Sequence, residues 1–161
     1  MSFGEHQAMT GVLTIELRDS QGALVDQRRV HNLITRGGKE LLANLLMGKV
    51  DALPNAWTIA VGTGATQTQM ADAALATPVD GADDRGPRVE VIDQGGTSVV
   101  RATVTATLPE RKQGEVQPLT EAGIRIKTKA GVEGILFNRV TFAPVNRGPN
   151  MVMTLSWEIT F

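Results

Sequence analysis

The sequence contains no cysteine and no tyrosine, and it has only two histidines. Without cysteine there can be no disulfide, no thiolate metal site and no cysteine nucleophile. His6 and His31 lie far apart, and neither has a second ligand at helical spacing, so a histidine metal site is not indicated. None of the serines lies in a Gly-x-Ser-x-Gly turn. A serine hydrolase is therefore not indicated either.

Aromatic residues and an excess of one charge are also scarce. Aromatic residues make up 4% of the chain, and Lys plus Arg (16) nearly cancel Asp plus Glu (17). This neutral balance argues against a nucleic-acid partner, whose phosphates usually require a basic surface. Stacking platforms for sugars are few, and Trp57 and Trp157 are the candidates. No apolar stretch approaches the roughly twenty residues of a membrane span.

Strands dominate what is present. In residues 151–161 apolar side chains alternate with polar ones, which predicts a half-buried strand whose apolar side needs a second layer. Residues 99–108 alternate in the same way, and short turn signals separate the other candidate strands. We therefore predict a mainly β fold, an antiparallel β-sandwich of jelly-roll type with about eight strands and one amphipathic helix packed on it. The other expected strands are residues 12–17, 24–30, 57–61, 88–92, 119–127 and 135–142.

One segment has the pattern of a helix. Leucines recur at helical spacing within residues 41–46, Thr35 is a suitable N-cap, and Gly48 lies where a left-handed C-cap belongs. We expect this helix to pack on the sheet. The residues expected to anchor the helix and the last strand in the core are Leu41, Leu45, Trp157 and Phe161.

Residues 65–86 are rich in Ala, Thr, Gln and Asp, and we expect a long surface connection with one helical turn in residues 70–75. Gly62 and Gly64 precede it like a phosphate loop, but the third glycine and the Gly-Lys-Ser/Thr of such loops are missing, which favours a tight turn. Calcium prefers oxygen ligands in loops, yet the twelve-residue loop with its closing Glu is absent. For the carboxylates Asp80, Asp83 and Asp84, we favour solvated loop charges as the interpretation, and calcium binding stays open.

Four glutamates in or beside strands are the remaining candidates for catalysis. A glycosidase would need two acids that face each other across a cleft. Exposure, or pairing with an arginine, is the favoured interpretation for these side chains, so no enzyme and no cofactor is predicted. They are Glu90, Glu121, Glu133 and Glu158.

Five blocks in order resemble a family of small tailed-bacteriophage virion accessory proteins. They are residues 32–48, which begin Asn-Leu-Ile-Thr, Ile-Ala-Val-Gly-Thr-Gly-Ala-Thr at 59–66, Thr-Glu-Ala-Gly-Ile at 120–124, Leu-Phe-Asn-Arg-Val-Thr-Phe at 136–142, and Leu-Ser-Trp-Glu-Ile-Thr-Phe at 155–161. Together they span most of residues 30–161. The chain departs from shorter members in residues 1–30 and in the acidic insert around residues 80–84.

The resemblance implies structural work in a virion, as a tail-fibre, collar, neck or capsid-decoration component, and no catalysis. The implied partners are further copies of the chain, in a trimer or ring, and other virion proteins of the capsid, the portal or neck, or the tail. Neither a membrane nor nucleic acid is expected as a partner. The implied location is the virion, assembled in the cytoplasm of the bacterial host. The alternative is a module of a phage fibre that binds glycans on the host surface.

The N-terminal residues are polar and have no period, so we expect an arm at residues 1–9 before one sandwich domain at residues 10–161. Such an arm offers strand exchange with a neighbour. We hypothesise that it crosses to another subunit or to the capsid or neck. Its residues are Met1, Ser2, Phe3, Gly4, Glu5, His6, Gln7, Ala8 and Met9.

Overall fold

The alternating segments form two layers of antiparallel strands. The computed structural model describes residues 9–128 and 134–161, with only the backbone of Gln94. Over these residues the elements are β1 (Thr10–Arg18), β2 (Leu24–His31), β3 (Leu33–Ile34), α1 (Arg36–Leu46), β4 (Ala56–Gly62), β5 (Pro78–Asp84), β6 (Arg88–Gln94), β7 (Thr97–Leu108), β8 (Gln117–Lys127), β9 (Ile135–Leu136), β10 (Asn138–Arg147) and β11 (Val152–Thr160).

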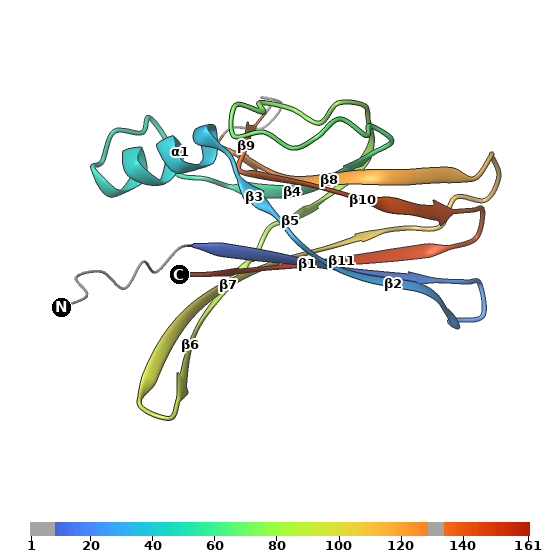
Figure 1. The fold of residues 1–161 in the computed structure, drawn as a ribbon, viewed down its shortest axis with the longest axis horizontal. Coiled ribbons are helices and arrows are strands. Elements are labelled where there is room, and N and C mark those ends of the chain that lie inside the picture. Colours follow the sequence, from blue (N-terminus) through green and yellow to red (C-terminus); the bar gives the residue numbers. More distant parts are fainter. Residues whose placement is uncertain (1–8, 129–133) are drawn as a thin grey trace.

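The first sheet has the strand order β2-β1-β11-β7-β6, and the second has the order β3-β10-β8-β4-β5, with β9 paired to β8. Every pairing is antiparallel. Figure 1 shows the two layers face to face, with α1 at one end of the second layer. The predicted mainly β sandwich with one helix is therefore confirmed.

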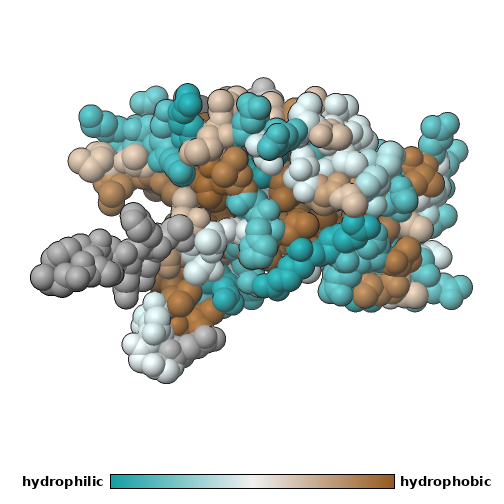
Figure 2. Space-filling view, viewed as in Figure 1, coloured by the Kyte–Doolittle hydropathy of each residue, from teal (hydrophilic) through white to brown (hydrophobic). Residues whose placement is uncertain are grey.

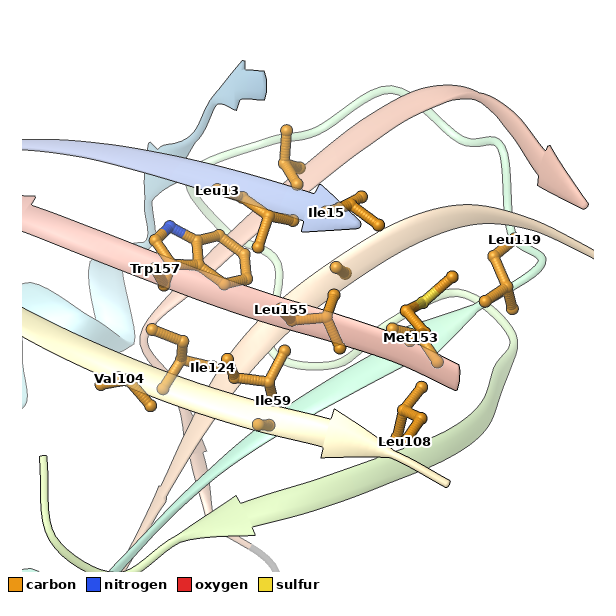
Figure 3. Close-up of a cluster of buried hydrophobic side chains, with 14 of the residues drawn as sticks. Leu13, Ile15, Ile59, Val104, Leu108, Leu119, Ile124, Met153, Leu155 and Trp157 are labelled. Carbon is orange, nitrogen blue, oxygen red and sulfur yellow. The ribbon is translucent and has the colours of Figure 1, made fainter. Parts of the chain in front are cut away.

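Between the sheets lies a core that the period-two pattern builds. Leu13 and Ile15 of β1 and Leu155 and Trp157 of β11 face Ile59 and Ile124 of the second sheet (Figure 3). Successive strand residues point to opposite faces, so the apolar half of each strand is inward. Burying one such side chain contributes about 1.5–3 kcal/mol.

The predicted helix forms as α1, between the predicted cap residues Thr35 and Gly48. The Thr35 hydroxyl accepts a hydrogen bond from the Gly38 N–H at 3.0 Å, and Gly48 has a φ of +67°, the left-handed conformation of a C-cap. Leu41 is buried and Leu45 is half-buried.

Of the anchors predicted for the last strand, Trp157 is fully buried, but the prediction for Phe161 is wrong. Phe161 follows the end of β11 and its side chain is 45% exposed. Its N–H donates to the carbonyl of Val100 at 2.9 Å, so the chain continues along β7 toward the projecting β6–β7 hairpin. The alternation holds to the last residue, but Phe161 only borders an apolar hollow of about 180 Å³.

The expected surface connection over residues 65–86 is also wrong in part. Its second half is β5, which pairs with β4, and residues 70–75 contain no helical turn. Leu75 is buried with Ala60 and Leu136 on the outer side of the second sheet. β5 reads Pro-Val-Asp-Gly-Ala-Asp-Asp and lacks apolar alternation, so its strand conformation comes from backbone pairing along β4.

Met9, the last residue of the predicted arm, is half-buried and packs against the core. The rest of the predicted arm, residues 1–8, lies outside the described residues, as does Glu133.

Candidate functional site

A buried ion pair connects two of the sequence blocks. Glu121 of β8 and Arg139 of β10 lie diagonally across neighbouring strands, because Glu121 is opposite Thr141 in the register. Two nitrogens of Arg139, Nη2 and Nε, contact Glu121 Oε2 at 2.9 and 3.0 Å. The side chains are 2% and 0% exposed. Both residues alternate with core residues, so they lie on the outer face of the second sheet, beneath the segment 63–77.

The glycine-rich block binds the carboxylate of this pair. The N–H groups of Gly64, Ala76 and Thr77 donate to Glu121 at 3.1, 2.9 and 2.7 Å. A Cβ at Gly62 or Gly64 would lie 2.5 or 2.6 Å from Glu121 Oε1, closer than real Cβ atoms come. The loop that resembles a phosphate loop therefore encloses the protein's own carboxylate.

Arg139 fastens the covering segment from the other side. Its Nη1 donates to Asp72 Oδ2 at 3.0 Å, and its Nη2 donates to the carbonyl and the hydroxyl of Thr66 at 3.0 and 3.1 Å. One guanidinium thus joins β8, β10 and residues 66–72. Arginine suits this task because its planar fork presents five donors in fixed directions.

The chemistry of Glu121 follows from its surroundings. Burial alone would raise its pKa, but the hydrogen bonds from the Thr77 and Ala76 N–H groups, from Arg139 and from the Gly64 N–H outweigh burial, so the pKa of Glu121 lies below its usual value. A carboxylate held ionised by so many donors is poorly suited to proton transfer at neutral pH. Its function in this position is to hold the covering segment on the sheet.

The first and last blocks meet in a second buried contact. The indole N–H of Trp157 donates to Asn32 Oδ1, and the Asn32 N–H donates to the Gly11 carbonyl at 3.0 Å. A Cβ on Gly11 would lie 1.9 Å from Asn32 Oδ1. Asn32 therefore fixes Trp157 in the core and requires glycine at position 11.

The helix block contacts the fourth block directly. The Thr35 hydroxyl donates to the carbonyl of Leu136 at 2.5 Å, and a Cβ on Gly38 would lie 2.4 Å from the Phe137 carbonyl. The structure thus brings all five blocks into one connected frame. Sequence reasoning missed Asn32 and Arg139 as partners, and it considered Glu121 only as one of four glutamates.

The acidic insert does not gather around one point. Asp80 contacts Arg147 at 2.7 Å, Asp83 accepts from the Thr58 hydroxyl, and Asp84 accepts from the Thr105 N–H at 2.8 Å. Each carboxylate thus serves a different neighbour. Among the described residues, no group of three or more His, Cys, Asp or Glu could hold a metal ion.

Of the other glutamates considered for catalysis, Glu158 lies 3.6 Å from Arg101, so it pairs with an arginine as predicted. Glu90 is exposed, also as predicted.

An exposed apolar surface lies on the β6–β7 hairpin, which projects from the sandwich (Figures 1 and 2). Val89 and Val91 of β6 are 72% and 65% exposed, and Val100 of β7 and Phe161 beside it are also exposed. These side chains continue the core-facing side of the first sheet beyond the reach of the second. Half-buried Trp57 lines the adjoining hollow.

Comparison with known protein families, with curated proteins and with solved structures found no match. The resemblance described above therefore rests on the sequence blocks. In the part of the chain that the structure describes, no helix is long and apolar enough to cross a membrane.

Proposed function

We propose that the chain is a non-enzymatic structural protein of a tailed-bacteriophage virion, a collar or neck, tail-accessory or capsid-decoration component that docks as a symmetric oligomer on the particle. One observation supports this most. The five blocks that carry the resemblance touch one another. The contacts are those of Asn32 with Trp157, Thr35 with the fourth block, Gly64 with Glu121, and Glu121 with Arg139. The blocks therefore form one frame in the fold.

The contacts between the blocks also indicate which parts of the chain are available to bind partners. The residues that join the blocks, such as Asn32, Trp157 and Glu121, are occupied by mutual contacts, so we expect partners to be recognised mainly by other parts of the chain. A component repeated around a particle needs only modest contacts per copy, because symmetry multiplies them. The projecting β6–β7 hairpin and the N-terminal segment are the candidates.

The proposal is tested on particles made by the phage that encodes the chain. We expect purified virions to contain the chain in a fixed copy number that matches the symmetry of the neck, the tail or the capsid, measured by quantitative mass spectrometry. Electron microscopy with a label on the chain would give its position. Virions that lack the chain would contradict the proposal.

The predicted arm is tested in the same particles. We expect removal of residues 1–8, which spares Met9 and its contact with the core, to lower incorporation into virions while the isolated protein keeps its circular dichroism spectrum. Unchanged incorporation would exclude a docking function for this segment.

The alternative, a glycan-binding module, makes a different prediction. Sugar sites use exposed aromatic rings. Trp157 is buried and Trp57 is half-buried in an apolar hollow, which leaves the partly exposed Phe161 beside it as the ring that such a site would use. A glycan array in which the isolated chain binds host-surface sugars, together with virions that carry the chain only at fibre tips, would favour the alternative.

A further inference from the structure

An edge strand whose pairing has no bulge is the strongest unexplained feature of the surface. β6 forms seven consecutive pairs with β7, from Arg88↔Thr103 to Gln94↔Thr97, without a bulge. The ladders of the other two long edge strands are irregular. β2 pairs with β1 with a register shift between residues 17 and 18 of β1, and β5 pairs with β4 with a shift between residues 61 and 62 of β4. β5 also begins with proline and carries three aspartates. Bulges, prolines and charges are devices that keep edges from pairing with other chains. β6 also carries charges, at Arg88, Glu90 and Asp93, so the unbroken ladder is what distinguishes it.

The free edge of β6 presents backbone groups in a known order. Gly95 and Gly96 have φ values of +55° and +87°, so a two-residue turn of type I′ closes the hairpin on the Gln94↔Thr97 pair. Hydrogen-bonded and non-hydrogen-bonded pairs alternate from that point. By this alternation the N–H and C=O groups of Val89 and Val91 are directed away from β7, toward the open edge.

A second copy of the same strand can meet this edge in few ways. Antiparallel pairing about a two-fold axis places one residue opposite itself. A centre at Glu90 would set two glutamates against each other, which is unfavourable. A centre at Val91 would place Val89 opposite Asp93, an apolar side chain against a carboxylate.

The centre at Val89 is self-complementary in charge. It places Arg88 of each copy opposite Glu90 of the other, so two ion pairs form on one face of the joined sheet and the two Val89 side chains meet on the other. Both Arg88 and Glu90 are exposed. Arg101, the residue opposite Glu90 on β7, already pairs with Glu158, which leaves the Glu90 carboxylate for the second copy. Pro87 has no N–H and ends the paired segment on its side.

We propose that β6 is a homodimer interface, in which its free edge pairs antiparallel with β6 of a second copy about a two-fold axis at Val89, with Arg88 opposite Glu90. This deepens the proposed function, since it rests on the oligomeric state included there. The pairing joins the two five-stranded sheets into one continuous sheet. Because the axis is perpendicular to that sheet, the apolar sides of both β6–β7 hairpins lie on the same face and their valines become neighbours.

The first test uses reversed charges. Sedimentation equilibrium of the isolated chain should give twice 17.2 kDa for the wild type and a shift toward 17.2 kDa for Arg88→Glu and for Glu90→Arg, because each variant sets like charges against each other. An equimolar mixture of the two variants should recover the dimer, since the two glutamates of one variant then face the two arginines of the other. A monomeric wild type, or single variants that stay fully dimeric, would overturn the proposal.

The second test uses the central contact. Val89→Lys places two lysines opposite each other and should abolish the dimer. The matched control is Val25→Lys on β2, at the other edge of the same sheet, where the valine is 49% exposed. The control should remain dimeric, and far-UV circular dichroism should show both variants folded. Equal loss of the dimer in both variants would overturn the assignment to β6.

The outcomes for this interface and for the virion location are separate. A dimer that depends on Val89, from a chain that is absent from virions, supports the interface and contradicts the proposed function. A monomeric chain that virions nevertheless contain in fixed copy number contradicts the interface alone.

Discussion

At the scale of the residue, the Glu121–Arg139 pair is the best-connected polar contact of the second sheet. We expect Glu121→Gln to lower the free energy of unfolding by about 3 kcal/mol, because it leaves the buried guanidinium of Arg139 with Asp72 as its remaining counter-charge. Urea denaturation measures the loss. The control is Glu158→Gln, whose partly exposed pair with Arg101 should contribute less than about 1 kcal/mol. Equal losses in the two variants would contradict the importance of burial.

The same residue predicts a dependence on pH. The pKa of Glu121 is lower in the folded state than in the unfolded chain, so its contribution to stability is complete above the unfolded pKa and disappears as the pH falls through the folded one. The wild type should therefore lose more stability between neutral pH and strongly acidic pH than Glu121→Gln does. Urea titrations across that range measure the difference. Parallel curves for the two proteins would show that Glu121 does not titrate in this way.

Single residues also show where the sequence is a poor guide. Glu121 and Arg139 become partners only through the register of β8 and β10, which places Val140 opposite Ala122. Asn32 and Trp157 are still farther apart in the chain, and nothing in the local pattern of either block indicates the other. The glycines at 62 and 64 are visible in the sequence, but their purpose depends on a carboxylate that comes from another strand.

At the scale of the element, α1 is held by its N-cap. Thr35 is fully buried, and its hydroxyl accepts from the Gly38 N–H and donates to the Leu136 carbonyl. We expect Thr35→Ala to cost about 1–2 kcal/mol of stability, measured by thermal or urea denaturation. Thr35→Ser keeps the hydroxyl and should cost less. If serine is as destabilising as alanine, the methyl group and not the cap is what matters.

Elements with strong local patterns could be predicted from the sequence, and elements made by their neighbours could not. β7 and β11 alternate over most of their length, and α1 has both a cap and a leucine stripe. β5 has proline, glycine and three aspartates within seven residues. It is a strand because its backbone pairs with β4 and because Glu121 and Arg139 fix the preceding residues 66–77. That information is tertiary and lies outside the segment itself.

At the scale of the whole molecule, the two sheets share one core. Leu13 and Trp157 from the first sheet and Ile59 and Ile124 from the second belong to the same buried cluster. Within the described residues, the other buried cluster is much smaller and consists of Ala60, Leu75 and Leu136. This arrangement suits the predicted single domain over residues 10–161, in which neither layer is stable without the other.

The two tryptophans make this prediction testable, because Trp57 lies in β4 of the second sheet and Trp157 in β11 of the first. In Trp57→Phe, Trp157 is the only tryptophan that fluoresces, and in Trp157→Phe, Trp57 is the only one. In each variant we expect the fluorescence change and the far-UV circular dichroism change to coincide along a urea titration, since losing either layer exposes the common core. The midpoint for Trp157→Phe should be lower, because phenylalanine fills less of the core and leaves Asn32 Oδ1 without its donor. A fluorescence transition of Trp57 that precedes the circular dichroism transition would show that the second sheet unfolds separately, and the chain would then have two cooperative units.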